Sequence, residues 1–481
     1  MELDERRVAD IVERVVKELV NPGVPAVAGN GVSRAASATV AAFAGVGGNS
    51  GIFNTPDECI AASEQAFADL KAGGYAMRRT VVAVIREVSL RQAEAWGKQA
   101  RDETGMGRAS DKKLKNEAVA KGSPGVEDLD RRYLKGDDGL HLVEGVPWGV
   151  ICSITPSTNP TATVINNSIT MISAGNTVVF CPHPSAKNCT IRTIAEINEA
   201  IVRAGGPRNL LTCVADPTLK VAMSIMTHER IRIIAATGGP GVVRAAFDTK
   251  KKVFAAGPGN PPVLVDTTAD IARAGEMTVL GSCFDNNLPC VAEKVAIAES
   301  RVLDDYVAAL VRAGAHLLNA GDIERILPVV LDGDHPRRKS IGQDAAELLR
   351  RAGIAFRGDP RLVIGVLPED HPMVIHEQMM PFLPIVRVRD FDDGLRLAVK
   401  VEHGYGHTSI LHSRDTDHIT RFADALGTTI TVFNGPSYAF SGDLGEGYAT
   451  MTVTTPTGEG VTSPRTWQRR RHIVYAGMLN T

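Results

Sequence analysis

The chain has 481 residues, 44% of them apolar and 22% charged, which indicates a globular protein of two or three domains. Its formal net charge of -2 argues against a nucleic-acid partner, because neutralising phosphates requires a basic excess. No run of about 20 apolar residues is present to span a membrane, and the acidic N-terminus lacks an apolar signal core, so we expect a cytoplasmic protein without a membrane partner.

Residues 1–20 are predicted to form an amphipathic helix. Apolar residues follow helical spacing from Leu3 to Val20, charged residues occupy the other side, and a Pro-Gly pair at 22–23 ends the pattern. Residues 21–50 are rich in Gly, Ala, Val and Ser, which predicts a flexible linker. A short tethered helix needs a partner surface for its apolar stripe. The alternative is that it packs on its own domain or on a sister subunit.

Residues 51–131 and 148–260 are predicted to form one α/β domain, interrupted by a hairpin at 132–147 that turns at 136–139. The first part, about 53–125, is helical in pattern. Strands are then predicted at 149–155, 177–181, 210–215, 230–237 and 253–256, alternating with helices at 161–174, 188–204, 217–228 and after Gly241. This alternation predicts a parallel sheet with right-handed crossovers, as in Rossmann-type nucleotide-binding domains.

A second α/β domain is predicted over residues 261–448. Strands are expected at 262–266, 294–298, 362–366, 384–389, 408–412 and 429–433, with helices at 268–283 and 303–316. Residues 449–481 return to β-like alternation outside this rhythm, so together with 132–147 they are predicted to form a β-arm. The arginine run at 469–471 is expected to be a solvated strand end.

Cys290 follows a loop of polar and turn-forming residues between a predicted helix and a predicted strand. The other cysteines are scattered without a CxxC pair or a His/Cys cluster, which predicts reduced thiols and no metal site. These cysteines are at positions 59, 152, 181, 189, 213 and 283. Thiolate reactivity requires access and electropositive surroundings, and such a loop can supply both. The pattern alone leaves Cys290 as either a nucleophile or a small core residue.

The segment FDNNLPC (284–290), followed by VAEK, resembles the nucleophile loop of CoA-acylating aldehyde dehydrogenases, the propionaldehyde and acetaldehyde enzymes of bacterial microcompartments. The resemblance covers about 145–475 and includes TPSTNPTATVINNSI (155–169), AGNTVVFCPHPSAK (174–187), TGGPGVVRAAF (237–247), AGPGNPP (256–262), GHTSILHS (406–413), NGPSYA (434–439) and TPTGEGVTSPRT (455–466). It implies an aldehyde dehydrogenase-like α/β fold with a Rossmann-type cofactor domain, an α/β catalytic domain and a β-arm for oligomerisation.

By this resemblance, Cys290 adds to the aldehyde carbonyl to give a thiohemiacetal, which becomes a thioester when hydride passes to NAD. The developing oxyanion needs preorganised donors. The family match assigns that role to the Asn159 side chain, with the backbone N–H of Cys290 as the second donor. Asn-Pro pairs also begin helices, so a helix cap or turn residue is the alternative for Asn159.

The resemblance also assigns contacts with the NAD cofactor. The turn Thr237-Gly238-Gly239 lies where a predicted strand leads into a helix, and its glycines would let a pyrophosphate approach the helix amides. His183 occupies the place of a ribose-contacting lysine in hydrolytic relatives, with turn packing as its alternative, and Glu377 resembles the family's nicotinamide-ribose glutamate. The remaining residues expected at the cofactor are Thr155, Pro156 and Gly257.

A missing carboxylate distinguishes the two chemistries of the family. Hydrolytic aldehyde dehydrogenases carry a glutamate before a Gly-Gly pair, as base for the deacylating water, whereas residues 256–260 here read AGPGN. A thiol such as coenzyme A is therefore expected to take the acyl group. His407 matches a histidine of acylating relatives and could help deprotonate that thiol, although a structural histidine is the equal alternative.

The sequence thus predicts oxidation of a short aliphatic aldehyde to its acyl-CoA with reduction of NAD, inside a microcompartment whose shell protein binds residues 1–20. The hairpin and the C-terminal β-arm predict a homodimer or homotetramer. Two alternatives are a hydrolytic aldehyde dehydrogenase that releases a free acid and a noncatalytic cargo protein that organises the shell.

Overall fold

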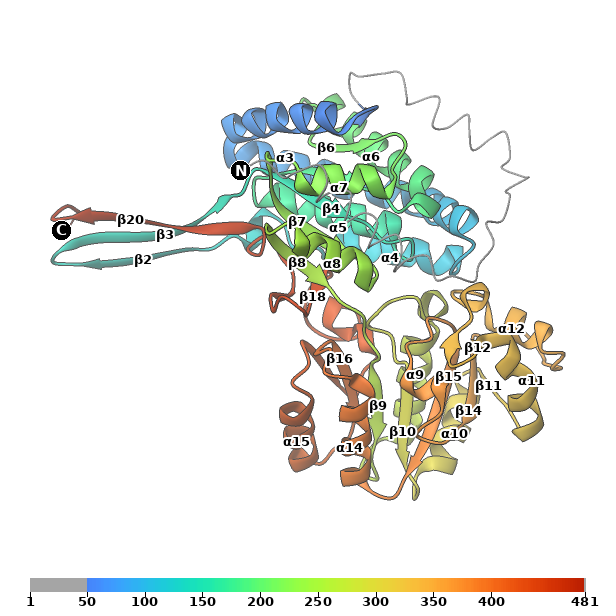
Figure 1. Ribbon diagram of the computed structural model, residues 1–481. Coiled ribbons are helices and arrows are strands. Elements are labelled where there is room, and N and C mark those ends of the chain that lie inside the picture. Colours follow the sequence, from blue (N-terminus) through green and yellow to red (C-terminus); the bar gives the residue numbers. More distant parts are fainter. Residues whose placement is uncertain (1–49, 480–481) are drawn as a thin grey trace. The chain divides into compact units, whose positions relative to one another are not determined.

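The computed structural model describes residues 50–479, which form two compact units (Figure 1). The predicted helix 1–20 and the predicted linker, apart from its last residue, lie outside the described residues. The first unit comprises the described residues up to Glu103, Lys115–Ala256 and Thr450 onward, and the second comprises Thr104–Leu114 and Gly257–Ala449. The predicted domain boundaries therefore need correction, because 104–114 and 257–260 belong to the second unit.

The first unit is built on a six-stranded parallel sheet with the order β1-β6-β5-β4-β7-β8. Its strands are β1 (Ile52–Phe53), β4 (Val150–Ile154), β5 (Thr177–Cys181), β6 (Leu211–Val214), β7 (Ile231–Thr237) and β8 (Lys252–Ala256). The chain adds β5 and β6 on one side of β4 and then returns to add β7 and β8 on the other. The switch point of the sheet, where ligands of such folds bind, therefore lies between β4 and β7.

Helices cover both faces of this sheet, as the sequence pattern predicts. They are α3 (Pro56–Thr104), the part of α4 (Ala109–Gly122) from Lys115 onward, α5 (Pro160–Ser173), α6 (Lys187–Arg203), α7 (Leu219–Thr227) and α8 (Pro240–Asp248). One core cluster packs α7, α8 and the start of α3 against alternate residues of the strands, whereas α5 and α6 pack on β5 and β6. Helix α3 is broken at Gly74, whose φ of 62° is not helical.

The predicted hairpin is confirmed, and it extends from the rest of the first unit as a ribbon (Figure 1). Its strands β2 (Arg131–Gly136) and β3 (Gly139–Pro147) are joined by the third strand of the arm, β20 (Gln468–Ala476), which pairs antiparallel with β3. The arginine run is exposed on β20, as expected.

The C-terminal segment contributes less to the arm than predicted, because only 468–476 of 449–481 pairs with it. Strands β18 (Val453–Thr454) and β19 (Gly460–Val461) form a small separate hairpin. Trp467 is fully buried, and its indole N–H donates to Thr170 Oγ1 of α5 at 3.1 Å. Trp467 therefore holds the end of this segment in the core of the first unit, directly before the arm strand β20 begins.

The second unit contains a seven-stranded parallel sheet with the order β11-β14-β15-β10-β9-β16-β17. Its strands are β9 (Pro262–Val265), β10 (Val295–Glu299), β11 (Ala315–Leu317), β14 (Leu362–Val366), β15 (Phe382–Val388), β16 (Thr408–His412) and β17 (Ile430–Phe433). The predicted helix 303–316 is too long, because Gly314 adopts a φ of 105° and the next three residues form edge strand β11.

The helices of the second unit are α9 (Ile271–Cys283), α10 (Leu303–Arg312), α11 (Ala320–Val330), α12 (Ala345–Arg351), α13 (Pro372–Ile375), α14 (Phe391–Glu402) and α15 (Thr416–Leu426), and a short hairpin consists of β12 (Leu331–Asp332) and β13 (His335–Pro336). Strands β10, β9 and β16 are neighbours in the sheet. The segments that enter these strands therefore meet at one sheet edge, and they contain Cys290 and His407. Within residues 50–479, no helix is long and apolar enough to cross a membrane.

Candidate active site

Cys290 lies on a loop with a strained backbone. Helix α9 ends at Cys283, and the residues Asp285, Asn286 and Asn287 then adopt φ values of 46°, 55° and 64°. This left-handed conformation is unfavourable for residues other than glycine and is most accessible to Asn and Asp. The Asn287 amide nitrogen donates to the carbonyls of Ser282 at 2.8 Å and Glu293 at 2.9 Å, which ties the two ends of the loop together.

A buried ion pair holds the start of this loop. Asp285 is fully buried, and its carboxylate accepts from Lys112 Nζ at 3.0 Å and from the backbone N–H of Arg108 at 2.9 Å. Gly107 has a φ of 76°, and a Cβ there would lie 2.0 Å from Asp285 Oδ1, so only glycine fits. Segment 104–114 thus fastens the loop that leads to Cys290.

Exposure separates Cys290 from the other cysteines. The chain has seven cysteines, and six of them are buried, whereas Cys290 is partly exposed. Cys181 and Cys213 lie in buried strands, where burial raises the pKa of the Cys213 thiol well above its usual range. Access alone therefore favours Cys290 as the nucleophile over the core-residue alternative.

Lys294 is a buried cation beside Cys290 that sequence reasoning left without a role. Its ammonium group donates to the Asn287 carbonyl at 2.7 Å, to Asn287 Oδ1 at 2.6 Å and to the Pro289 carbonyl at 3.2 Å. Burial lowers the pKa of Lys294, and the nearby Glu377 and Cys290 groups act in the opposite direction. The available signal was its position directly before an apolar strand, where a charge must find partners inside the protein.

Glu377, Cys290 and His407 come together around Gly259. The Glu377 carboxylate lies 4.0 Å from Lys294 Nζ and accepts from the backbone N–H of Gly259, while burial raises its pKa. A Cβ on Gly259 would lie 2.9 Å from the Cys290 carbonyl oxygen and 3.0 Å from His407 Cγ. Three residues predicted from separate blocks thus surround one glycine, and the predicted cofactor residue Gly257 is two positions before it.

His407 is fully buried, which bears on both interpretations of it. Its Nδ1 lies 2.8 Å from Thr408 Oγ1, whereas Nε2 has no hydrogen-bond partner within residues 50–479. Burial, and secondly the charge of Lys294, lower the pKa of His407 to about 4. The imidazole is therefore neutral near pH 7, the form that accepts a proton, although such a low pKa makes it a weak base.

In the first unit, two predicted cofactor residues flank the switch point of the sheet. Thr155 follows β4, and Thr237 ends the adjacent strand β7. Both hydroxyl groups are buried, and neither has a hydrogen-bond partner among residues 50–479. A Cβ on Gly239, at the start of α8, would meet open space, so a phosphate can approach the backbone at this position. These unsatisfied groups fit a dinucleotide.

His183 and Pro156 lie on the turns that follow β5 and β4. The exposed His183 ring accepts at Nδ1 from the Ser185 backbone N–H at 3.2 Å and also contacts the Ser185 hydroxyl at 2.8 Å. His183 therefore caps its own turn, which agrees with turn packing, the alternative given for it above. Pro156 is half-buried in the turn after β4. Their contacts with a cofactor stay predictions.

Asn159 occupies the position that caps α5, but its side chain makes no capping hydrogen bond. Instead, Asn159 Oδ1 accepts from Lys115 Nζ at 2.5 Å, and Nδ2 donates to Thr158 Oγ1 at 3.1 Å. The capping alternative is therefore not supported for the side chain. Lys115 was missed because nothing in the sequence links it to a residue 44 positions away.

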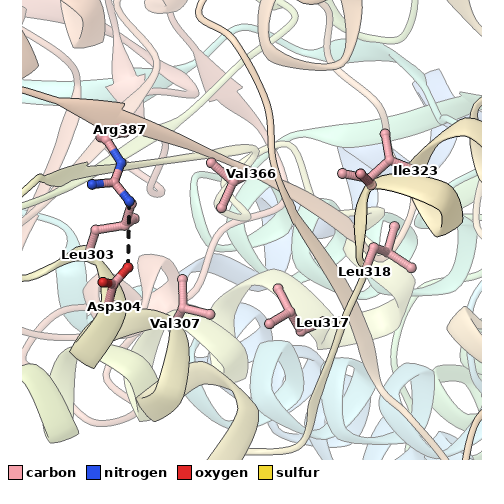
Figure 2. A pocket seen from close by; sticks show the side chains of 9 residues that line it. Leu303, Asp304, Val307, Leu317, Leu318, Ile323, Val366 and Arg387 are labelled. Atoms are coloured by element: carbon pink, nitrogen blue, oxygen red, sulfur yellow. Dashed lines mark ion pairs between the residues drawn. The ribbon is translucent and has the colours of Figure 1, made fainter.

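A separate groove of about 430 Å³ opens in the second unit between α10, β11, α11 and the sheet (Figure 2). It is lined by Leu303, Asp304, Val307, Leu317, Leu318, Ala320, Ile323, Val366 and Arg387. An ion pair of 3.6 Å joins Arg387 to Asp304 at its side (Figure 2), and no predicted site residue reaches it. Among the described residues, no group of three or more His, Cys, Asp or Glu side chains is arranged to hold a metal ion.

Comparison with known proteins identifies close relatives. Residues 54–442 match the model of the aldehyde dehydrogenase family. The acetylating acetaldehyde dehydrogenase EutE of Salmonella typhimurium is 45% identical over 431 residues, which is 88% of this chain and 92% of that protein. A propionaldehyde dehydrogenase from the fucose utilisation microcompartment of Clostridium phytofermentans has a TM-score of 0.88 and 42% identity, over 89% and 99% of the two chains. The propionaldehyde dehydrogenase of Rhodopseudomonas palustris, solved with bound propionyl-CoA, has a TM-score of 0.89 and 40% identity, over 94% and 99%.

Proposed function

Because the chain belongs to the aldehyde dehydrogenase family, we propose that it oxidises a short aliphatic aldehyde to an acyl-CoA through a thioester on Cys290, with reduction of NAD. The observation that carries this proposal is the position of Cys290. It is the partly exposed member of seven cysteines, on a braced loop, with the Lys294 cation beside it. A nearby cation favours the thiolate, which is the nucleophilic form.

The chain's own groups account for each step of the reaction. The Cys290 thiolate forms a C–S bond to the aldehyde carbonyl, and the carbonyl oxygen becomes an oxyanion that accepts hydrogen bonds from the Asn159 amide and the Cys290 N–H. When bound, NAD supplies the hydride acceptor that turns this thiohemiacetal into a thioester. The thiol of coenzyme A then attacks the thioester carbonyl, the bond to Cys290 breaks, and the thiolate returns. The unpartnered His407 Nε2 is proposed to accept the proton of the attacking thiol.

Deacylation by a thiol rather than by water follows from the missing carboxylate. Residues 256–260 contain only Ala, Gly, Pro and Asn, and Gly259 has no room for a side chain between Cys290 and His407. No general base for water is therefore present in this block. The hydrolytic alternative would require a base from elsewhere in the chain.

The cofactor is proposed to bind at the C-terminal edge of the first unit's sheet. Thr155 and Thr237 would donate their buried hydroxyl groups to it, and the start of α8 would receive a phosphate. In the second unit, Glu377 is proposed to bind the nicotinamide ribose. One relative, an engineered glycolyl-CoA reductase, was solved with bound NADP+, so the preference of this chain for NAD is tested by comparing both cofactors.

The decisive experiment follows NADH formation from propionaldehyde with and without coenzyme A. Turnover that requires coenzyme A supports the proposal, whereas equal turnover without it supports hydrolysis, and none in either case supports a noncatalytic cargo protein. Cys290→Ala should abolish NADH formation. The matched variant Cys283→Ala removes a buried thiol only seven positions away and should stay active.

We also propose that residues 1–20 bind a microcompartment shell protein and that the β-arm joins subunits into a dimer or tetramer. Tyr133 and Leu134 on the outer arm strand β2 are each 70% exposed, which a protein–protein contact would cover. Deleting residues 1–20 should preserve activity but abolish co-purification with shell proteins. Tyr133→Lys with Leu134→Lys should shift the sedimentation coefficient to that of a smaller assembly.

A further inference from the structure

The orientation of the Asn159 amide depends on Lys115. We infer that Lys115 is a positioning residue for the proposed reaction: its ammonium group fixes the Asn159 amide so that the oxygen points to Lys115 and the nitrogen is presented to the oxyanion. The contact between Lys115 Nζ and Asn159 Oδ1 is 2.5 Å. This inference rests on the proposed function, because only an Asn159 that donates to substrate benefits from a fixed orientation.

The chemistry of the two groups determines which way the amide faces. An ammonium group has three donors and no acceptor, so the atom of Asn159 that faces Lys115 must be the oxygen. Charge-assisted hydrogen bonds are about twice as strong as neutral ones, so rotation of the amide by half a turn would exchange attraction for repulsion. The nitrogen gives one N–H to the Thr158 hydroxyl at 3.1 Å. Asn159 is half-buried, and Nδ2 makes no other hydrogen bond among residues 50–479, so its second N–H can donate to a ligand.

Lys115 is itself held rigidly. It is 6% exposed and lies on helix α4, whose next residue, Asn116, is also buried. Asn116 Nδ2 donates to the Ala93 carbonyl of α3 at 3.0 Å, and Asn116 Oδ1 accepts from the Thr161 hydroxyl of α5 at 2.9 Å. The second contact attaches α4 to the first turn of α5, the helix that begins beside Asn159. The ammonium group and its target are therefore fixed to one framework.

A purely structural role explains this arrangement less well. The start of α5 does not need the Asn159 side chain, because that side chain makes no capping bond, and the Asn159 carbonyl already accepts from Thr163 N at 3.0 Å. The pair therefore leaves helix formation unaffected and determines only which atoms of the amide face outward. Removing an oxyanion-hole donor lowers kcat by about 100- to 1000-fold, so a donor that points away for part of the time should lower kcat by about 10- to 100-fold.

The test compares Lys115→Met with Lys121→Met, which removes an exposed lysine from the same helix. Lys115→Met should slow the burst of NADH formation, which reports acylation, by about 10- to 100-fold without changing the KM for coenzyme A. Lys121→Met should behave as wild type. In an Asn159→Ala background, Lys115→Met should cause no further loss, because both changes remove the same donor. A wild-type burst rate for Lys115→Met, or losses that multiply in the double variant, would overturn the inference.

Asn159→Asp provides a second test that retains Lys115 and applies even if Lys115→Met fails to fold. Aspartate keeps an oxygen facing Lys115 but has no N–H to donate. This variant should be at least as thermally stable as wild type and as slow as Asn159→Ala. A clear fall in thermal stability would show that Lys115 does not bind this position and would overturn the inference. A normal burst rate for Asn159→Ala, with Cys290→Ala inactive, would instead reject the oxyanion role within the proposed function.

Discussion

Replacing Lys294 with methionine should destabilise the second unit and slow Cys290 chemistry together. Methionine retains most of the buried volume but loses every donor. The change leaves three oxygen atoms without their ammonium donor, namely the Asn287 carbonyl, Asn287 Oδ1 and the Pro289 carbonyl. Each buried acceptor left unsatisfied costs about 1–3 kcal/mol, and relief from burying the charge offsets part of the sum. We therefore expect a loss of about 3–5 kcal/mol, the range found when one partner of a buried ion pair is removed.

Calorimetry and alkylation measure the two effects separately. In a unit of this size, about 2–4 °C of Tm corresponds to each kcal/mol, so the thermal midpoint should fall by about 10 °C. The rate of Cys290 alkylation by iodoacetamide should fall, and its half-maximal pH should move upward, because a neighbouring positive charge is gone. The control Lys400→Met removes an exposed lysine that pairs with Glu369 at 3.2 Å, and it should change stability by less than about 1 kcal/mol. A Tm within about 2 °C of wild type, with unchanged alkylation, would refute the reasoning.

Three further predictions concern the residues around this centre. Burial raises the pKa of Glu293 to about 7, whereas its pKa in the unfolded chain is near 4.5. Between these two values the folded state binds more protons than the unfolded state, so the protein loses stability as the pH rises. Glu293→Gln lacks this penalty, so its Tm advantage over wild type should grow between pH 5 and pH 8, and an advantage that is independent of pH would contradict the assignment. His407, with its pKa lowered to about 4, is already neutral above about pH 5.5, so His407→Gln should lower kcat without removing any limb near pH 6.5 from the pH–rate profile. Gly259→Ala should reduce activity by more than about 10-fold, since its Cβ would lie 2.9 Å from the Cys290 carbonyl oxygen, whereas Gly136→Ala in the arm meets open space and should be neutral in the same assay.

The sequence predicted the elements whose signal is local. Strands such as Thr177–Cys181 and Leu362–Val366 are continuous apolar runs between turn residues, and their bounds agree with the structure. Helix α10 was predicted too long because Ala315–Leu317 is apolar enough to continue a helical pattern, and the left-handed Gly314 that ends the helix has no periodic signature.

The groups that support the site could not be predicted in the same way. Lys112 and Asp285 are 173 residues apart, so neither periodicity nor spacing relates them. Burial of Lys115 also depends on tertiary packing, because a lysine in a sequence is usually a solvated residue. Cys290 was a candidate from its loop alone, whereas the roles of the other site residues came from similarity to a family, and their partners became visible only when the chain was folded.

The left-handed run at 285–287 limits how this chain can be redesigned for other aldehydes. A saturation library across the loop would return mainly Asn, Asp and Gly at these three positions, because other side chains clash with their own backbone there. Glycine at 286 would satisfy the backbone but lose the hydrogen bonds that Asn286 donates to the Gly342 carbonyl at 3.0 Å and to Asp344 at 2.9 Å. Useful sequence diversity is therefore expected at the half-buried Phe284 before the run rather than at Leu288 after it, which is buried.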